Sequence, residues 1–291
     1  DQATFADRAI GVSIALIATY LTATLWPMAI YARDTHDGMP FVVHLAVLLM
    51  AAAALRSGAP AVRTFRDLFP LAVGAYLYVE LRWLIPGTGR PHFDAMVQRW
   101  EHVLFPGNPS ATWAPAMPNV ALSELLHFAY ASYYFLVLVP PIVLYLRGRR
   151  DAYACTMLAL VVVYALCFAC YLVFPVDGPR YLYGPAVAPD GPIRAFVLHL
   201  LAAGSSRGTA FPSSHIGAAV VASLCALRFQ RPLGALVAAL TVGLALGTVY
   251  GGFHYAVDGL VGVMVGLISW WGAMAICRAL STPRQQTATA A

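Results

Sequence analysis

The chain has 291 residues, of which 60% are hydrophobic and only 11% are charged. Soluble domains carry roughly a quarter charged residues, so this composition excludes an ordinary soluble protein and indicates an integral membrane protein. The formal net charge is +5, and every basic residue is an arginine. Because no basic patch is interleaved with aromatic residues, we expect no nucleic-acid binding.

Eight apolar segments follow one another along the chain, and each is long enough to be interpreted as a membrane-spanning helix. They cover about residues 9–32, 40–55, 69–86, 121–146, 153–174, 212–229, 233–252 and 254–279. The second segment is short for a span. The sequence therefore predicts an all-α integral membrane protein, a bundle of about eight transmembrane helices.

Two long connections, residues 86–118 and 175–211, are rich in Pro and Gly. With eight spans, both lie on the same side of the membrane. The side with the termini and the short loops carries eleven arginines, and the side with the long loops carries six. Positive charge marks the cytoplasmic side, so we expect cytoplasmic termini and long loops that face the periplasm or the cell exterior.

The five cysteines all lie in apolar segments and are interpreted as small buried hydrophobic residues. Cys167 and Cys170 form a CxxC pattern without a nearby histidine, so we expect neither a redox site nor a zinc site there.

For several acidic residues in the first half of the chain, the sequence allows both a structural and a functional role. Glu80, near the end of the third segment, is either structural or orients an active-site arginine. Glu124 and His127 lie three residues apart on one helix face, but a second such pair is missing, so a structural hydrogen bond is favoured over a metal site. Asp94 and Glu101 in the first long loop are expected to be solvated at the interface, with headgroup contact as the alternative.

The stretch "FPVDGPRY", residues 174–181, ends the fifth segment. Its Arg180 carries a planar guanidinium whose donors match the oxygens of a phosphate. Taken alone, an arginine in this position is typical of a loop beside lipid headgroups.

The stretch "FPSSH", residues 211–215, begins the sixth segment. Pro212 suits the first helical position, and the next amides, those of Ser213, Ser214 and His215, then lack intrahelical partners. Such a helix start binds anions, and the two hydroxyls add donors. The alternative is a helix cap with a structural histidine.

The stretch "GTVYGGFHYAVDGLVG", residues 247–262, contains His254 and Asp258 four residues apart. On a helix this spacing places both side chains on one face. A carboxylate there can hold one imidazole nitrogen and leave the other free as a nucleophile. The alternative is a His–Asp pair that stabilises a helix end. Gly243, Gly247 and Gly251 are interpreted as sites of close helix packing.

Together, the three motifs resemble the type-two phosphatidic acid phosphatase superfamily, with "PSSH" and "VYGGFHYAVD" as the specific elements. The resemblance covers roughly residues 69–279. It implies a six-helix phosphatase-like core within a catalytic membrane domain over 69–280. Residues 1–68 are then additional N-terminal transmembrane helices, and 281–291 a disordered tail.

Two positions depart from the superfamily's pattern. Val173 stands where its first motif usually has a lysine, and Thr248 where its third motif usually has an arginine. In this the chain is more similar to the branch with inositol phosphorylceramide synthase and sphingomyelin synthase. The stretches "VLFPG" (103–107) and "SELLHFAYASYY" (123–134) also look like bacterial members of that branch.

The resemblance implies catalysis through a phosphohistidine without a metal or other cofactor. His254 would attack phosphorus, Asp258 would orient it, and His215 would act as general acid and then base. Arg180, Ser213, Ser214 and the amides of 213–215 would hold the phosphoryl oxygens. Arg207 would replace one of the missing cations, with Arg194 as a weaker candidate.

The expected activity is that of a membrane phosphotransferase, which moves a phosphoryl or phospho-headgroup from a lipid to a hydroxyl acceptor. The alternatives are a lipid phosphate phosphatase that uses water and a non-enzymatic lipid transporter or scaffold. The partners are a lipid phosphate substrate and membrane lipids, and the lipid tail would lie against the spans. The site would face outward from a bacterial inner or plasma membrane. The sequence does not identify the lipid, the acceptor or the oligomeric state.

Overall fold

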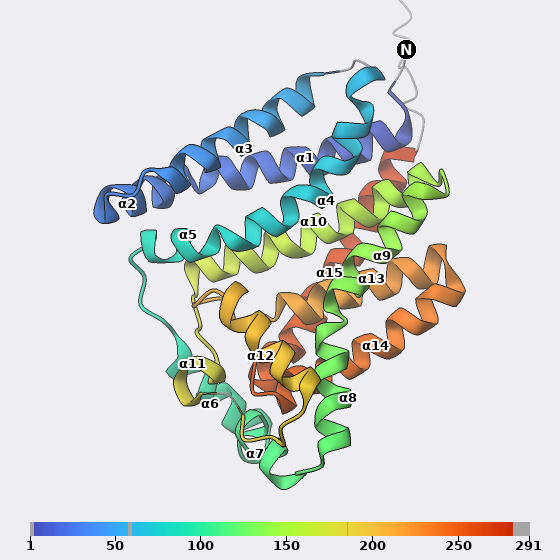
Figure 1. Ribbon diagram of the computed structural model, residues 1–291. Coiled ribbons are helices and arrows are strands. Elements are labelled where there is room, and N and C mark those ends of the chain that lie inside the picture. Colours follow the sequence, from blue (N-terminus) through green and yellow to red (C-terminus); the bar gives the residue numbers. More distant parts are fainter. Residues whose placement is uncertain (1–2, 58–59, 185, 282–291) are drawn as a thin grey trace, which may run out of the picture.

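The computed structural model describes residues 3–57, 60–184 and 186–281, and these residues form helices joined by connections without a sheet (Figure 1). One isolated parallel bridge joins Val176 and Thr209. Of the tail predicted over 281–291, Ser281 ends the last helix, and the other residues lie outside the described part of the chain.

All eight predicted segments are helical. In chain order they are α1 (Phe5–Ala23) with α2 (Leu25–Thr35), α3 (Met39–Arg56), α4 (Arg63–Val79) with α5 (Leu81–Gly87), α8 (Val120–Ala131) with α9 (Tyr133–Leu146), α10 (Arg150–Val173), α13 (Ser214–Phe229), α14 (Arg231–Tyr250) and α15 (Ala256–Ser281). The predicted fold class, an all-α membrane bundle, is confirmed.

Within the described residues, five helices are long and apolar enough to cross a bilayer alone: α1, α3, α10, α14 and α15. The pairs α4–α5 and α8–α9 are bent by 50° and 41°, and they raise the number to seven if each pair crosses as one span. Helix α13 is apolar but has 16 residues, fewer than the ~20 that a span usually needs.

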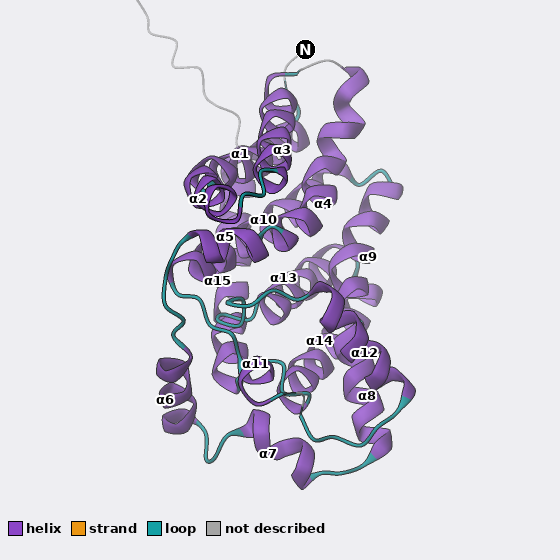
Figure 2. Cartoon of the chain, turned by 60° about the vertical axis from the view of Figure 1, so that its left-hand side comes forward, coloured by secondary structure: helices purple, strands orange, loops and turns teal. Residues whose placement is uncertain are grey.

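The remaining elements belong to connections: η1 (Pro60–Val62), α6 (Asp94–Leu104), α7 (Pro109–Ala116), α11 (Pro179–Tyr183) and α12 (Pro192–Gly204). Figures 1 and 2 both place α6, α7, α11 and α12 at the end of the molecule away from the N-terminus. The two long loops therefore gather at one end, as the sequence predicts.

An arginine at the start of α10 ties the N-terminal helices to the rest of the bundle. The Arg150 guanidinium donates to both carboxylate oxygens of Asp67 on α4, at 2.6 and 2.7 Å, and to Asp7 on α1 at 2.8 Å. Helices α1 and α4 also share one hydrophobic core with α10. The division of the chain between residues 68 and 69 stays a prediction.

A fully buried polar pair holds the opposite ends of α1 and α4. His44 on α3 lies with Nδ1 2.8 Å from Glu80 Oε2 and Nε2 2.8 Å from the Leu21 carbonyl oxygen. Both ring nitrogens therefore face oxygen atoms, and the pair shares a proton in the bundle interior. This contact supports the structural interpretation of Glu80, whose other oxygen, Oε1, is buried without a hydrogen-bond partner among the described residues.

Glycines allow α13 and α15 to approach at backbone distance. A Cβ at Gly262 would lie 2.6 Å from the Ser213 carbonyl oxygen, and a Cβ at Gly266 would lie 2.7 Å from that of Gly217. Any other residue at these positions would push the two helices apart. On α14, Gly247 lies against the backbone of α8 in the same way, so the predicted packing role of that glycine is confirmed.

Two of the five cysteines are buried as predicted but also form a bond that the sequence did not predict. Cys155 on α10 and Cys277 on α15 are joined by a disulfide. Spacing could not reveal this pair, because 122 residues separate the two positions. Cys167 and Cys170 are unpaired.

Substitution of His44 by alanine tests the buried pair. The change leaves the Glu80 carboxylate buried without its partner, and breaking such a pair costs about 3–5 kcal/mol. We expect a lower midpoint of thermal unfolding in detergent micelles than for His199→Ala, which removes an exposed imidazole on α12. Equal midpoints for the two variants would contradict this role for His44.

Candidate active site

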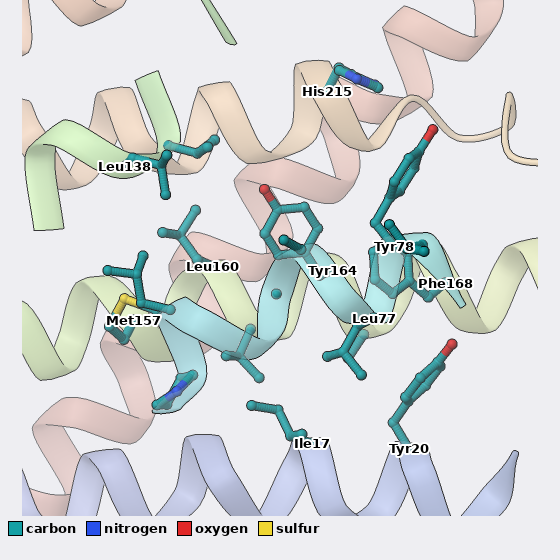
Figure 3. A pocket seen from close by; sticks show the side chains of 18 of the residues that line it. Ile17, Tyr20, Leu77, Tyr78, Leu138, Met157, Leu160, Tyr164, Phe168 and His215 are labelled. Carbon is teal, nitrogen blue, oxygen red and sulfur yellow. The ribbon is translucent and has the colours of Figure 1, made fainter. Parts of the chain in front are cut away.

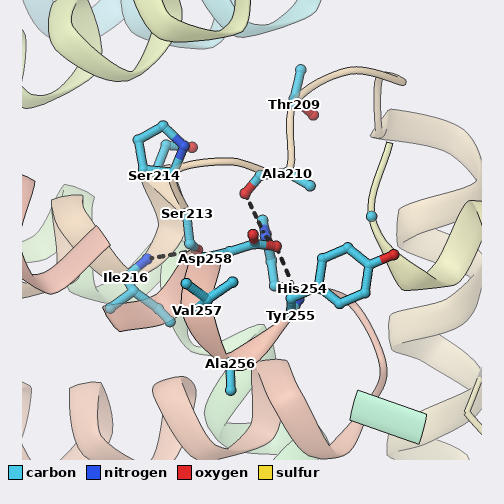
Figure 4. A network of polar contacts seen from close by, with 12 residues as sticks. Thr209, Ala210, Ser213, Ser214, Ile216, His254, Tyr255, Ala256, Val257 and Asp258 are labelled. Carbon is cyan, nitrogen blue, oxygen red and sulfur yellow. Dashed lines mark hydrogen bonds and ion pairs between the residues drawn. The ribbon is translucent and has the colours of Figure 1, made fainter. Parts of the chain in front are cut away.

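His254 lies in the short connection between α14 and α15 and is held by two acceptors (Figure 4). Its Nδ1 is 2.8 Å from the Ala210 carbonyl oxygen and 3.4 Å from Asp258 Oδ2. A carbonyl oxygen only accepts, so Nδ1 carries the hydrogen and Nε2 keeps its lone pair. The sequence predicts the His254–Asp258 contact, but the shorter of the two contacts is made by Ala210.

Burial governs the protonation of this imidazole. His254 is 5% exposed, and burial lowers its pKa to about 4. The positive charge of Arg180 acts in the same direction, while the Ala210 hydrogen bond opposes the shift. The ring is therefore neutral at pH 7, as a nitrogen nucleophile requires.

Asp258 joins the two C-terminal motifs through both its side chain and its backbone. Its Oδ2 accepts the Tyr255 N–H at 2.9 Å, which fixes the turn after His254. Its carbonyl oxygen accepts the Ser213 N–H at 3.0 Å. The carboxylate is fully buried, and its Oδ1 has no hydrogen-bond partner among the described residues.

The start of α13 differs in detail from the predicted anion site. Ser213 is the N-cap, its Oγ accepting the Ile216 N–H at 3.4 Å, so Pro212 precedes the cap instead of occupying the first helical position. The Ser213 amide donates to Asp258, and the Ser214 amide donates to the Tyr171 hydroxyl at 3.1 Å. The expectation that both amides are free for an anion is therefore wrong.

His215 lies beside His254, with the two ring centroids 5.9 Å apart. Its Nδ1 is buried and has no hydrogen-bond partner within the described ranges. Tyr133 and Tyr130 pack against the ring, with centroids at 4.4 and 5.6 Å. The structure thus brings together the two imidazoles that the sequence separates by 39 positions.

Two arginines gather around one aromatic ring at this end of the molecule. Arg180 on α11 contacts Ser205 Oγ and lies 4.6 Å above the Tyr181 ring. Arg207 lies 5.1 Å from the same ring and is two-thirds exposed, with Asp177 Oδ2 at 3.7 Å. Arg194 instead contacts Asp190 and the Ala186 carbonyl oxygen. Arg180 and Arg207 are therefore the two arginines beside Tyr181, and Arg194 has a structural role.

Helix α6 supplies two carboxylates, Asp94 and Glu101, that accept backbone N–H groups next to the site residues. Asp94 accepts the N–H groups of Asp177 and Gly178, at 3.0 and 2.9 Å, in the turn that precedes Arg180. Glu101 accepts those of Ala256 and Val257, at 3.0 and 2.8 Å, where α15 begins. Both carboxylates are buried, so their expected place at the solvated interface is wrong.

Glu124, the acidic residue of the fourth predicted segment, also holds backbone N–H groups with its carboxylate. Glu124 accepts the N–H groups of Ile193 and Arg194, both at 2.9 Å, and so caps α12. His127 Nδ1 contacts the Ser123 carbonyl oxygen at 2.7 Å. Both residues therefore have structural contacts, as favoured, but with separate partners instead of with each other.

One group of potential metal ligands lies among the described residues, formed by His92, Asp94 and Asp177. Both Asp94 oxygens already accept backbone N–H groups, and Asp177 Oδ1 accepts the Gly208 N–H and contacts His92 Nδ1, each at 2.9 Å. The sequence did not predict this cluster. Its oxygens serve as a hydrogen-bond network that holds the turn before Arg180.

A sequence model of the PAP2 superfamily matches residues 96–272, which is more than half of the chain. The chain belongs to the PAP2 superfamily. The matched region contains Arg180, the Ser-Ser-His helix start and the His254–Asp258 pair, and it begins after α5. No curated protein and no solved structure matches the chain. Membership makes it a membrane phosphatase-like enzyme with phosphate esters as its substrate class, in a superfamily whose members are metal-independent.

Leucine at Gly262 tests the contact that assembles this PAP2 site. The side chain would collide with the Ser213 backbone and separate the starts of α13 and α15. Overpacking of this kind costs about 1–3 kcal/mol, so we expect a lower unfolding midpoint and reduced phosphate-ester turnover. Gly272→Leu on the same helix is the control, because a Cβ there meets nothing within 4 Å. Wild-type behaviour of Gly262→Leu would contradict the proposed packing constraint.

Proposed function

We propose that the protein is a lipid phosphotransferase that works through a phosphohistidine on His254. The observation that carries the proposal is the convergence of two imidazoles, 5.9 Å apart, one of which has its Nδ1 tied to Ala210. Neutral His254 presents Nε2 as a nucleophile, and His215 has an unpartnered Nδ1 beside it. A purely structural role requires neither feature.

In the first step, the lone pair of His254 Nε2 forms a bond to phosphorus, and the bond from phosphorus to the leaving oxygen breaks. Burial lowers the pKa of His215 to about 3 in the free protein, so in this scheme His215 takes up a proton as the phosphate anion binds beside it and then gives that proton to the leaving oxygen. The imidazole of His254 becomes cationic, and the buried carboxylate of Asp258 at 3.4 Å stabilises this charge. The Ala210 carbonyl keeps the Nδ1 hydrogen in place throughout the step.

In the second step, the acceptor hydroxyl gives its proton to neutral His215 and attacks phosphorus. The bond between phosphorus and Nε2 breaks, and both imidazoles return to their starting states. Arg180 and Arg207 stabilise the charge on the phosphoryl oxygens. The hydroxyls of Ser213 and Ser214 add donors from the helix start. No metal takes part in this scheme.

The charge of the site favours transfer from a substrate with a phosphodiester or similarly low charge. A phosphomonoester carries about two negative charges and a diester one. The superfamily's two additional cationic positions are Val173 and Thr248 here, and Thr248 donates its hydroxyl to the Leu244 carbonyl oxygen. This loss supports the similarity to the branch with inositol phosphorylceramide synthase and sphingomyelin synthase. Hydrolysis with water as acceptor is the alternative.

The distribution of arginine supports an orientation. Eleven arginines on the side of the termini favour a cytoplasmic location of that side in a bacterial inner or plasma membrane. The active site then faces the periplasm or the exterior, next to the headgroups of the outer leaflet. A lipid headgroup and a second lipid or polyol hydroxyl both reach a site placed there.

Substitution of His254 by alanine tests the catalytic proposal. We expect turnover of labelled phospholipids and polyprenyl phosphates to fall by at least about a hundredfold, the lower limit for loss of a catalytic proton-transfer or nucleophilic group. His199→Ala is the matched control. Activity should persist in EDTA, because the scheme uses no metal. Unchanged turnover in His254→Ala, or reversible loss in EDTA, would contradict the mechanism.

The products of the same assay separate the alternatives. Label that moves onto an added hydroxyl acceptor supports transfer, whereas free phosphate as sole product supports hydrolysis. Wild-type protein that turns over none of these lipids, with or without acceptors, favours a non-enzymatic transporter or scaffold.

The pH dependence of kcat/KM tests the state of His254. An ordinary imidazole titrates near pH 6.5, whereas burial lowers the pKa of His254 to about 4. The neutral nucleophile is lost only as the pH falls through the lower value, so we expect the acid limb of kcat/KM near pH 4. A phosphodiester substrate avoids the second phosphate ionisation near pH 6. An acid limb near pH 6.5 with such a substrate would contradict the buried, neutral His254.

A further inference from the structure

An apolar cavity of about 290 Å³ opens beside His215 and extends into the bundle (Figure 3). Its walls come from α1, α4, α9 and α10, and Figure 3 shows His215 on one side and Ile17 and Tyr20 of α1 on the opposite side. Most of the lining is apolar; the hydroxyls of Tyr133 and Tyr164 pair with each other at 2.7 Å, and the buried Tyr20 hydroxyl has no partner among the described residues. A phosphate held at the site would thus lie at the mouth of an apolar chamber.

Two independent estimates give the size of the ligand that fits. An apolar cavity of ~150 Å³ accepts the six carbons of benzene, so this one accepts roughly twelve carbons. Along α10 the lining residues run from Met157 to Phe168, which at 1.5 Å per residue is about 16 Å. That length is about half of the ~30 Å hydrocarbon core, the reach of one lipid chain. The volume therefore fits a single chain, and the length gives the depth that this chain reaches.

The cavity also has a side from which a lipid can enter. Helices α4 and α9 both pack on α10, but their further neighbours differ. Helix α4 also packs on α1 and α3, whereas α9 also packs on α13 and α14. Between them lie Gly74 and Ala75 from α4 and Tyr134 and Leu138 from α9, which all line the cavity. Tyr134 and Leu138 are also exposed at the surface of the bundle. A chain that diffuses in the bilayer thus meets an opening between α4 and α9.

We propose that this cavity binds the hydrocarbon chain of the substrate, and that the protein selects phosphate esters of lipids with one chain. This inference rests on the proposed function at His254 and His215. It places the tail inside the bundle instead of against the outer surface of the spans. Because α1 and α4 lie outside the region that matches the PAP2 superfamily, half of the wall is specific to the N-terminal part of this chain.

The test measures kcat/KM for phosphodiesters that carry one head group and one alkyl chain of increasing length, from butyl upward, and for a two-chain phospholipid with the same head group. Burial of one methylene is worth a factor of about four, so we expect kcat/KM to rise by that factor per methylene and to level off near roughly twelve carbons. The two-chain lipid should react more slowly than the best one-chain ester. A profile without dependence on chain length, or a preference for the two-chain phospholipid, would overturn the inference.

A cavity-filling variant provides the second measurement. A Cβ at Gly74 meets nothing within 4 Å, so phenylalanine there projects into the cavity. We expect Gly74→Phe to lower the ratio of long-chain to short-chain kcat/KM by about tenfold or more and to move the limit to shorter chains. Gly272→Phe, in open space on α15, should keep the wild-type ratio. Equal ratios in Gly74→Phe and wild type would contradict the binding site.

These outcomes also distinguish failure of the inference from failure of the proposed function. If the wild type turns over no ester of any length, the proposed function fails. If it turns over esters but shows neither a chain-length limit nor a shift in Gly74→Phe, only the chain-binding site fails. Should Gly74→Phe not fold, the wild-type series decides alone.

Discussion

The close approach of α13 and α15 is the constraint on which the site depends. The Ser213 N–H donates to the Asp258 carbonyl at 3.0 Å, and Gly262 leaves room for the Ser213 backbone. These contacts align the beginnings of two helices that are distant in sequence. His215 lies just after the start of α13, and His254 lies just before the start of α15. The distance between the imidazoles is therefore set by backbone packing, which is stiffer than any side-chain contact.

Backbone acceptors and donors extend this constraint to the first motif. The bridge between Val176 and Thr209 holds the segment before Arg180 beside the segment before α13, and Ala210 donates its N–H to Val176 at 2.8 Å. The carbonyl of the same Ala210 accepts from His254. Three motifs are thus joined in one network before any substrate binds. Such preorganised groups need little rearrangement when charge develops on a phosphoryl group.

The sequence predicted those parts of the fold and site that depend on local patterns. Apolar segment length gave all eight helical regions, and the spacing of His254 and Asp258 gave their contact. Partners distant in sequence could not be found in this way: Glu101 with Ala256, and His44 with Glu80. One sequence shows that a carboxylate is present but not which N–H group it meets. The same limit explains the error about the α13 amides, since their acceptors come from α10 and α15.

The cavity that α1 and α4 help to enclose explains why polar contacts are needed to hold these helices in place. In a bilayer, apolar helices gain little by leaving lipid, so helix association depends on close packing and on polar contacts. Helices that surround a cavity forgo part of that packing. In this protein the Arg150 network holds α1 and α4 on α10 at one end of the cavity. The His44 pair joins the Leu21 carbonyl of α1 to Glu80 at the other end. Strong polar contacts at both ends compensate for the missing contacts between them, and they allow an apolar space to remain beside His215.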